Sequence, residues 1–457
     1  MSTVNFSDLS LSQEMLHNLN KIGYKQTTPV QAATLPHILK GRDVIAQAKT
    51  GSGKTAAFGI GLLTKLQVKK YCVQTLVLCP TRELADQVAK ELRVLARFAD
   101  NIKILTLCGG TAFRPQEDSL RHEAHIIVGT PGRVLKHLDK NTLNLKDVDT
   151  LIFDEADRML DMGFIDDIEK VLAYTPKNRQ TLLFSATYTD EIRAISDKFQ
   201  SNAMSIKTTD TEVANKITEV FYEVKEASKF NALVNVLSTY QPENVIIFTN
   251  TKAEANELAQ SLKNHNIDAL ATHGDLEQYE RNDVLVQFAN KSCRILIATD
   301  VAARGLDIKE LAMVINYDIP HNEETYTHRI GRTARAGQKG IAITLYNSNR
   351  SFKALNYQTK TTLYEDSNTL KTVQDFEMKP LYKTLVIEAG KKDKLRPGDL
   401  LGALTGDVGV AGNTIGKIDI YDRQSYVAID GTLINSVHKK LSNGKIKGKK
   451  FPVWLLK

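Results

Sequence analysis

Short apolar runs alternate with amphipathic stretches from about residue 40 to residue 345. We predict strands at six of the apolar runs, at 43–48, 75–80, 102–107, 125–130, 150–155 and 181–186. Between several of them lie stretches with helical periodicity, such as ELADQVAKELRVLARFA at 83–99. Strands that are apolar on both faces are typical of a parallel sheet with helices on each side. The pattern therefore predicts an α/β fold.

The strand-helix pattern occurs twice. The stretch TLVLCPTRELADQVAKEL (75–92) resembles NVIIFTNTKAEANELAQSL (244–262), and HIIVGTPGR (125–133) resembles CRILIATDVAARG (293–305). Two similar α/β halves, each of one domain's length, explain this repeat. The polar stretch 201–216 between the halves carries few large apolar residues, so we expect a linker there.

The pattern changes after residue 350. Residues 351–378 are polar and weakly patterned, which favours a helical extension and a connector. From Tyr382 the order is strand, helix, strand, strand, helix, strand, the ferredoxin-like arrangement of RNA-recognition modules. The chain ends in KLSNGKIKGKKFPVWLLK, either a frayed basic tail or a last strand. We favour a strand that Trp454 pins to a small core.

Together these patterns predict three domains. We expect a first α/β domain, a linker, a second α/β domain, a connector and an α+β domain, with bounds at 1–205, 206–216, 217–350, 351–378 and 379–457.

Composition indicates an ordinary soluble protein of the cytoplasm. Of the 457 residues, 42% are hydrophobic and 25% are charged, and no apolar run is as long as a bilayer span. The four cysteines form no CxxC pair or other zinc spacing, and the N-terminus lacks a signal-peptide pattern. We therefore expect no membrane association and no structural disulfides.

The positive charge is concentrated at the C-terminal end. Segment 379–457 has fifteen basic and seven acidic residues, a balance of +8, although the whole chain carries only +7. The preceding residues therefore sum to −1. This asymmetry indicates an acidic partner, and nucleic acid is favoured over a membrane because no strongly amphipathic basic helix is evident.

The stretch AKTGSGKT (48–55) has the features of a phosphate-binding loop, since it follows a predicted strand and opens a helix. Gly51 and Gly53 would let backbone N–H groups face phosphates, Lys54 would neutralise them, and the Thr55 hydroxyl would hold Mg²⁺. A glycine-rich surface turn is the alternative, but it would not require the GKT ending at a helix start.

Two further motifs complete an expected ATP site. In LIFDEAD (151–157), Asp154 would bind Mg²⁺ and Glu155 would act as general base, although an acidic helix start looks similar. In HRIGRTARAG (328–337), Arg332 and Arg335 are spaced to meet one phosphate if helical. Spacing alone leaves a basic solvated turn equally open for the second motif.

With these motifs in order, residues 6 to about 345 resemble the DEAD-box RNA helicases, a family named after the residues at 154–157. The resemblance implies two tandem RecA-like domains with parallel sheets. GYKQTTPVQ (23–31) resembles the adenine-reading motif, in which Gln31 would contact adenine and Tyr24 would stack on it. The implied nucleotide-binding residues are Phe6, Tyr24, Gln31, Ala48, Lys49, Thr50, Gly51, Ser52, Gly53, Lys54, Thr55 and Asp307.

The same resemblance implies RNA contacts and the residues that couple them to hydrolysis. PTREL (80–84), Gly109–Gly110, TPGR (130–133), IIFTNT (246–251) and ATDVAARGLD (298–307) resemble the RNA-backbone and coupling motifs. The implied RNA-binding residues are Pro80, Thr81, Arg82, Gly110, Thr130, Gly132, Arg133, Thr249 and Thr299, and the coupling residues are Ser185, Thr187 and His328. Ala334 stands where the family usually has glycine.

Segment 379–457 resembles the RRM-like RNA-binding domain of the DbpA branch of bacterial DEAD-box helicases, through KTLVIEAGKKDKLRPGDLLGAL (383–404) and GNTIGKIDIYDRQSYVAI (412–429). That branch acts on large-subunit ribosomal RNA and recognises a hairpin. SYVAI keeps Tyr426 but has few of the stacking aromatics of RNA-recognition modules. We therefore expect the hairpin to be held through phosphates by Lys391, Lys392, Lys394, Arg396, Lys445 and Lys447, with the neighbouring lysines to 450.

The resemblance implies an ATP-dependent RNA helicase, with ATP and Mg²⁺ as cofactors. It would act as a monomer on a pre-ribosomal particle and separate short duplexes of 23S ribosomal RNA during ribosome assembly. ATP would close the two RecA-like domains and bring Arg332 and Arg335 to the nucleotide. The alternatives are an ATP-gated RNA clamp or annealing factor and, with less support, a DNA helicase.

Overall fold

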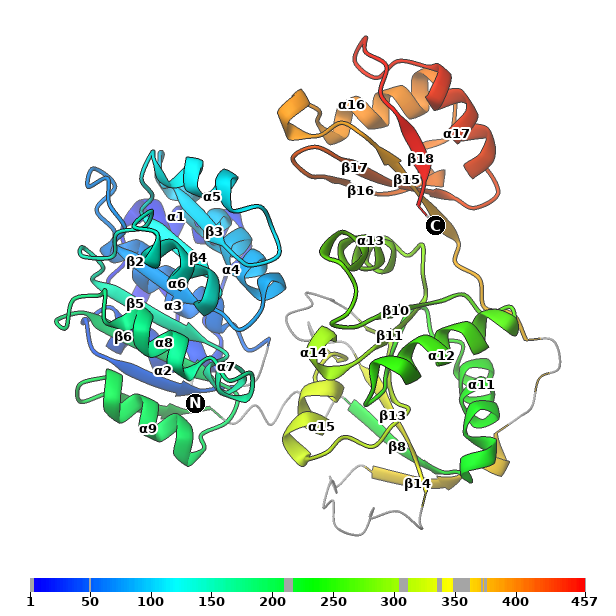
Figure 1. Ribbon diagram of the computed structural model, residues 1–457, viewed down its shortest axis with the longest axis horizontal. Coiled ribbons are helices and arrows are strands. Elements are labelled where there is room, and N and C mark those ends of the chain that lie inside the picture. The colour runs from blue at the N-terminus through cyan, green and yellow to red at the C-terminus, as the bar shows by residue number, and fades with distance from the viewer. Residues whose placement is uncertain are drawn as a thin grey trace. The chain divides into compact units, whose positions relative to one another are not determined.

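The structure is a computed structural model that describes residues 4–48, 51–208, 217–303, 311–334, 339–347, 362–370, 373 and 376–456. The chain divides into two compact units, and the described residues up to 208 belong to the first and those from 217 to the second. Figure 1 shows the first unit in blue to green and the second in green to red.

The first unit contains a seven-stranded sheet in which every pair of neighbouring strands is parallel. The strand order is β3-β4-β2-β5-β6-β1-β7. All six strands predicted from the apolar runs are confirmed. The strands are β1 (Val44–Gln47), β2 (Thr75–Leu78), β3 (Ile104–Leu107), β4 (Ile126–Gly129), β5 (Thr150–Asp154), β6 (Gln180–Ser185) and β7 (Met204–Lys207).

Helices cover both faces of this sheet, which explains why its strands are apolar at successive positions. Val77 of β2 packs in one core cluster with Phe58, whereas its neighbour Leu76 packs in a second cluster with Val134. The helices are α1 (Gln13–Lys21), α2 (Pro29–Ile38), α3 (Lys54–Lys65), α4 (Arg82–Leu95), α5 (Phe113–Leu120), α6 (Pro131–Asp139), α7 (Ala156–Asp161), α8 (Ile165–Leu172) and α9 (Asp190–Phe199).

The predicted linker at 201–216 starts too early, because part of this stretch belongs to the first sheet. Residues 204–207 form β7, which pairs in parallel with β1 at the edge of the sheet. The strand alternates half-buried and exposed residues, and an edge strand needs few large apolar side chains. A polar edge strand therefore looked like a linker. Residues 209–216 lie outside the described residues.

The second unit repeats this architecture. Its seven-stranded sheet has the order β10-β11-β9-β12-β13-β8-β14, which is the order of the first sheet offset by seven strands. The predicted repeat of two α/β halves is therefore confirmed. The elements are β8 (Ile217–Glu223), β9 (Val245–Phe248), β10 (Ala269–Thr272), β11 (Ile295–Ala298), β12 (Met313–Asn316), β13 (Gly340–Tyr346), β14 (Thr362–Asp366), α11 (Lys229–Tyr240), α12 (Lys252–Asn264), α13 (Gln278–Ala289), α14 (Asp300–Ala303) and α15 (Glu323–Ile330).

The stretch expected to be a helical extension and connector supplies the last strand of this sheet. Residues 362–366 form β14, which pairs in parallel with β8. The Tyr364 ring lies 5.3 Å from the Phe221 ring, centroid to centroid, and Leu370 and Met378 join the core. The helical prediction for 351–361 falls outside the described residues.

The C-terminal domain has the predicted β-α-β-β-α-β order and an antiparallel sheet with strand order β16-β17-β15-β18. Its two helices pack on the inner face, where alternate strand residues such as Leu385, Val427 and Leu455 form the core. The elements are β15 (Tyr382–Ile387), α16 (Pro397–Gly402), β16 (Ile415–Ile420), β17 (Ser425–Asp430), α17 (Ile434–Asn443) and β18 (Val453–Leu455).

The prediction that Trp454 pins the last strand to this core is wrong. Trp454 is 37% exposed and pairs with Val386 across the sheet. Successive residues of a strand face opposite sides, so Val453 and Leu455 reach the core and Trp454 lies on the outer face. The strand itself was predicted correctly.

Helix α13 covers part of this outer face. Val286 of α13 packs against Val386 and Tyr426, and the Tyr426 hydroxyl donates to Asp283 Oδ1 at 3.1 Å. Tyr426 is only 6% exposed. The ring that most resembles a base-stacking platform is therefore buried within the second unit. Our expectation that stacking is not the main mode of RNA binding stays a prediction.

A buried hydroxyl joins the two domains of the second unit. Thr384 Oγ1 accepts from Asn290 Nδ2 at 2.8 Å and donates to Ser292 Oγ at 2.8 Å. All three side chains are buried. A buried polar group that loses its partner costs about 1–3 kcal/mol, so this contact contributes to the junction.

We expect Thr384→Val to destabilise the second unit by about 1–3 kcal/mol, because it removes the partner of Asn290 and Ser292 without creating a cavity. Equilibrium urea unfolding measures the change as a shift of the transition midpoint. Thr414→Val is the matched control, since Thr414 bonds the Ala411 carbonyl at an exposed position. Equal shifts for both variants would contradict this account of the junction.

Candidate nucleotide and RNA sites

The described part of the loop between β1 and α3, Ala48 and residues 51–53, has features that suit phosphate binding. Gly51 and Gly53 have φ of 85° and 95°, a left-handed backbone that glycine adopts without strain. Lys54 is buried, and its Nζ donates to Ala48 O at 2.9 Å. Ser52 Oγ is buried and has no hydrogen-bond partner among the described residues. The start of α3 thus presents backbone N–H groups, a positive charge and a spare hydroxyl, which together suit a phosphate.

Gln31 connects the predicted adenine-reading motif to this loop. Its Oε1 accepts from Thr28 N at 2.9 Å, and its Nε2 donates to Gly53 O at 3.1 Å. Gly53 has a positive φ, and a Cβ there would lie 2.5 Å from Gln31 Nε2, so a larger residue would be strained and would displace the Gln31 amide. Phe6 and Tyr24 lie near each other, with ring centroids 6.2 Å apart. The contact of Gln31 and Tyr24 with adenine stays a prediction.

Asp154 is the last residue of β5, a fully buried strand, and Glu155 follows it directly. Burial raises the pKa of Asp154 to about 7, against the lowering effect of the Lys54 charge. Glu155 has φ of 54°, a conformation that costs a non-glycine residue about 1–2 kcal/mol. Its carboxylate forms a buried ion pair with Arg158, Oε2 to Nη1 at 3.1 Å. The helix start therefore holds one carboxylate that protonates easily and one that stays paired.

Asp157 links this motif to Ser185 and Thr187, the residues predicted to couple hydrolysis to RNA binding. Its Oδ2 accepts from Thr187 N at 3.1 Å and from Thr187 Oγ1 at 3.3 Å. Thr187 N also donates to Ser185 Oγ at 3.3 Å. The sequence motifs assigned no role to Asp157 or Arg158, although both lie within or beside the quoted motif. The partners of Asp157 become neighbours only through the parallel pairing of β5 with β6, whereas Glu155, the partner of Arg158, lies three residues away in the sequence.

Two of the predicted RNA-backbone motifs of the first unit lie against each other. Thr81 caps α4 by accepting from Leu84 N at 3.3 Å, and Pro80 precedes it. Arg82 lies beside Gly110, whose φ is 67°, and a Cβ on Gly110 would lie 2.0 Å from Arg82 Nη1. The positive φ favours glycine at 110, and a larger residue would also displace the Arg82 guanidinium. Their contact with RNA stays a prediction.

The third motif of this unit begins helix α6. Thr130 is its N-cap, and a Cβ on Gly132 would lie 3.1 Å from Asp167 Oδ2. The Arg133 guanidinium is held within the unit, because Nη2 donates to the Thr111 carbonyl at 2.9 Å. The structure therefore brings the three motifs to one edge of the sheet, where β2, β3 and β4 end.

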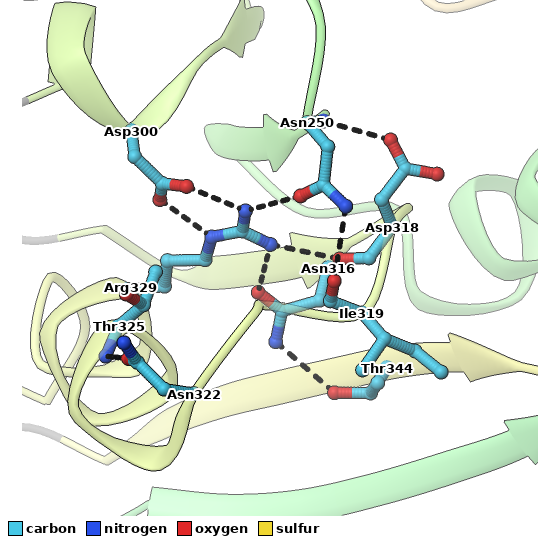
Figure 2. A network of polar contacts seen from close by, with 9 residues as sticks. All are labelled: Asn250, Asp300, Asn316, Asp318, Ile319, Asn322, Thr325, Arg329 and Thr344. Carbon is cyan, nitrogen blue, oxygen red and sulfur yellow. Dashed lines mark hydrogen bonds and ion pairs between the residues drawn. The ribbon is translucent and has the colours of Figure 1, made fainter. Parts of the chain in front are cut away.

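Figure 2 shows a buried polar network in the second unit that is centred on Arg329. Arg329 is 1% exposed, and its Nε and Nη2 donate to the two oxygens of Asp300 at 2.7 and 2.8 Å. Nη2 also donates to Asn250 Oδ1 at 2.9 Å, and Nη1 donates to the Asp318 carbonyl at 2.7 Å. One side chain thus joins the ends of β9, β11 and β12.

This network fixes the loops that carry the predicted RNA-binding residues Thr249 and Thr299, both of which are buried. Arg329 lies in the quoted motif HRIGRTARAG, but the sequence assigned it no role, because its N–H donors find their partners only in the folded sheet. His328 lies on the same helix, α15. Figure 2 shows how the partners of Arg329 converge from separate elements.

The predicted arginine motif is described only in part. Arg332 is buried, and Ala334, where the family usually has glycine, has φ of 56°. Alanine therefore keeps the left-handed backbone that glycine would favour. The remaining predicted residues Lys49, Thr50, Asp307 and Arg335 lie outside the described residues. The reach of Arg332 to ATP stays a prediction.

The predicted basic residues of the C-terminal domain gather in one patch. Lys447 Nζ donates to the Lys394 carbonyl at 3.0 Å and pairs with Asp399 at 3.3 Å, so the loop after β15 lies beside the loop before β18. Here we define the basic patch by its exposed cations, which are Lys391, Lys392, Lys394, Arg396, Lys445 and Lys447. The patch lies beyond the end of β15 rather than on the outer sheet face.

Within the described residues, no helix has both the length and the apolar character that crossing a bilayer requires.

Comparisons with known proteins agree with this geometry. Three family models match, the DEAD/DEAH box helicase at residues 28–195, the helicase conserved C-terminal domain at 228–337 and the DbpA RNA-binding domain at 384–455. The ATP-dependent RNA helicase DbpA of Escherichia coli is 50% identical over 99% of each chain. The DEAD-box ATP-dependent RNA helicase CshA of Bacillus cereus is 46% identical over 78% of this chain and 68% of its own.

Solved structures show the same fold. Dbp5 of S. cerevisiae, bound to RNA and ADP BeF3, is 32% identical with a TM-score of 0.72 over 80% of this chain and 96% of its own. Mss116p, bound to ssRNA and AMP-PNP, is 29% identical with a TM-score of 0.71 over 80% of each chain. The phosphate loop, the DEAD residues, the two matching sheets and the RNA-binding domain thus occur together, and the chain belongs to the DEAD-box family of ATP-dependent RNA helicases.

Proposed function

We propose that this chain separates short duplexes in large-subunit (23S) ribosomal RNA during ribosome assembly, and that RNA-stimulated ATP hydrolysis drives the process. We propose further that it acts as a monomer in the cytoplasm, on a pre-ribosomal particle. The observation that carries the proposal is the basic patch of a DbpA-type domain, joined to an RNA helicase whose predicted RNA motifs consist of small, hydroxyl-bearing and backbone-binding residues.

The C-terminal domain would select the site on RNA to which the protein binds. Its basic patch lies on two neighbouring loops, and lysines there reach phosphates without reading bases. The outer face, where RNA-recognition modules stack bases, is partly covered by α13. A structured RNA with closely spaced phosphates, such as a hairpin, is therefore the ligand that fits the patch best.

The residues of the first unit fit an ATP with Mg²⁺. The Asp154 carboxylate and the Thr55 hydroxyl supply the hard oxygen donors that Mg²⁺ prefers, and they would hold the ion next to the phosphate loop. When bound, Mg²⁺ would neutralise phosphate charge. Lys54 would bind the phosphates, and Glu155 would take the proton of the attacking water.

The proposed separation of strands by a local distortion of the RNA also implies a limit on the length of duplex that can be separated. Each base-pair step contributes roughly 1.4 kcal/mol of stacking, so one local distortion of the RNA backbone releases a short duplex and leaves a long one paired. Hydrolysis would then let the RNA dissociate.

The proposal is tested in cells by crosslinking the protein to RNA and sequencing what is retained. We expect fragments of large-subunit ribosomal RNA around one hairpin to be enriched, and the enrichment to disappear when the basic patch is neutralised. Uniform recovery of messenger and ribosomal RNA would contradict the proposed substrate.

Glu155→Gln should lower RNA-stimulated ATP turnover by about 10²–10⁴-fold, the usual contribution of a general base, while ATP and RNA still bind. A phosphate-release assay gives turnover, and fluorescence anisotropy with labelled RNA gives binding. Glu169→Gln, which removes an exposed charge paired with Lys198, is the control and should be unaffected. Ribosome assembly that continues normally with Glu155→Gln would favour an ATP-gated RNA clamp.

The pKa of Asp154, raised to about 7 by burial, predicts pH-dependent nucleotide binding. Mg²⁺ favours the ionised carboxylate, so binding of the ATP–Mg²⁺ complex below pH 7 must release the proton of Asp154, and the affinity should fall up to tenfold per pH unit. Above pH 7 the affinity should level off. Calorimetry in buffers of different ionisation enthalpy measures the released proton, and Asp154→Asn should abolish its dependence on pH. Equal proton release at pH 6 and pH 8 would contradict the assignment.

The double change Lys391→Gln and Lys392→Gln should flatten the salt dependence of hairpin binding, because each lost phosphate contact lowers the slope of log K against log salt by about 0.7–0.9. Filter binding at several salt concentrations measures this slope. The matched control is Lys383→Gln with Lys417→Gln, which removes the same charge from β15 and β16. If both pairs change the slope equally, the basic patch has no special role.

A further inference from the structure

Gln116 of α5 holds two of the predicted RNA-backbone motifs together. Its Nε2 donates to the Cys108 carbonyl at 3.0 Å and to Thr111 Oγ1 at 2.8 Å, and these residues flank Gly109–Gly110. Its Oε1 accepts from Arg133 Nη1 at 2.9 Å, in the turn that begins α6. One amide therefore bonds the loop after β3 and the loop after β4.

The surroundings of Gln116 leave its amide one orientation. The oxygen also meets His137 Nε2 at 3.1 Å, and the nitrogen faces a carbonyl and a hydroxyl, so a flipped amide would lose these bonds. His137 is buried and stacks on Phe113, with ring centroids 4.1 Å apart. Burial, with the nearby Arg133 charge, lowers the pKa of His137 to about 4. The imidazole is thus neutral at physiological pH and does not add a charge to the cluster.

The hydrogen bonds of Gln116 lie beyond the ends of β3 and β4, where the distance between the loops that follow these strands needs another constraint. At their base the loops are already joined, since Thr130 N donates to the Leu107 carbonyl at 3.0 Å. Beyond this point the strands have ended, and the backbone ladder no longer fixes the distance between the loops. Gln116 and Arg133 supply the contacts there, together with the Arg133 bond to the Thr111 carbonyl.

The geometry points to Gln116 as a positioning residue that presets the spacing of two RNA-phosphate contacts, at Gly109–Gly110 and at Thr130–Gly132. This inference rests on the proposed RNA-binding role of those segments. Successive phosphates of one strand are a fixed distance apart, so loops that are already in register bind RNA without first being ordered. Gln116 itself touches neither ATP nor, in this account, RNA.

Replacement of Gln116 should therefore change RNA affinity more than catalytic rate. In an ATPase assay with single-stranded RNA as the activator, Gln116→Leu should raise the KM for RNA by about tenfold, the size of one to two lost hydrogen bonds. The kcat at saturating RNA should stay within about twofold, because bound RNA restores the loop spacing. Gln116→Glu keeps the acceptor for Arg133 and should raise the KM less.

Gln74 provides a matched control. It is buried, its Nε2 donates to the carbonyls of Gln67 and Lys70 at 2.9 and 2.8 Å, and its Oε1 accepts from Gln67 N at 2.9 Å. It precedes β2, at the edge of the sheet opposite the RNA motifs. Gln74→Leu thus removes a similar number of side-chain hydrogen bonds, at a more buried position, and should lower the melting temperature while leaving the KM for RNA unchanged.

Equal KM values for Gln116→Leu and Gln74→Leu would overturn the inference, as would a loss of kcat with no change of KM. If Gln116→Leu does not fold, as judged by circular dichroism, the pair Gln116→Glu and Gln74→Glu is compared by the same criterion. A wild-type protein whose ATPase is not stimulated by RNA would overturn the proposed function, and the positioning role with it. If RNA stimulates the ATPase of the wild-type protein but Gln116→Leu and Gln74→Leu have the same KM for RNA, the positioning role alone is overturned.

Discussion

The parallel pairing of strands is the constraint on which both helicase units depend. Because all strands of such a sheet end at one edge, loops that are far apart in sequence meet there. In the first unit this edge brings Lys54, after β1, near Asp154, at the end of β5. In the second unit it brings Asn250 and Asp300 to Arg329. The motifs are short because the sheet, rather than the local sequence, places them.

Two of the buried charges described at these edges, on Glu155 and Arg329, have compensating partners. An uncompensated buried charge costs several kcal/mol, so Glu155 is paired with Arg158 and Arg329 is enclosed by acceptors. Loss of one residue of such a set of partners leaves its partner buried without a compensating charge. The motifs that contribute residues to the same set therefore depend on one another. Asp154 differs, because burial is only partly offset by Lys54. Its carboxylate is therefore the one whose ionisation a bound cation would favour.

Sequence patterns predicted the strands, the repeat and the order of the C-terminal domain, because hydrophobic period and turn residues are local properties. The residues they missed act through long-range contacts. Gln116 and Arg329 look like ordinary polar helix residues until the strands pair, and β14 is too polar to be distinguished from a connector. Trp454 was placed on the wrong face because apolar character indicates burial but not which side of a strand is buried. Residue types thus indicated which motifs to expect, whereas the pairing of the strands determined which side chains contact one another.

The two sheets share one topology yet differ in what their edges do. The strand that corresponds to β1 is β8, and it is followed by Val224 and Lys225 rather than by a pair of glycines before a helix. The position of Asp154, at the end of β5, corresponds to the end of β12, where Asp318 is paired with Lys229 and accepts from Asn250 N. Among its described residues, the second edge has no counterpart of the Gly51–Gly53 turn, and the Asp318 carboxylate holds the loop after β9 in place. The same topology therefore carries different loops in the two units, so the sheet order alone does not decide what each edge binds.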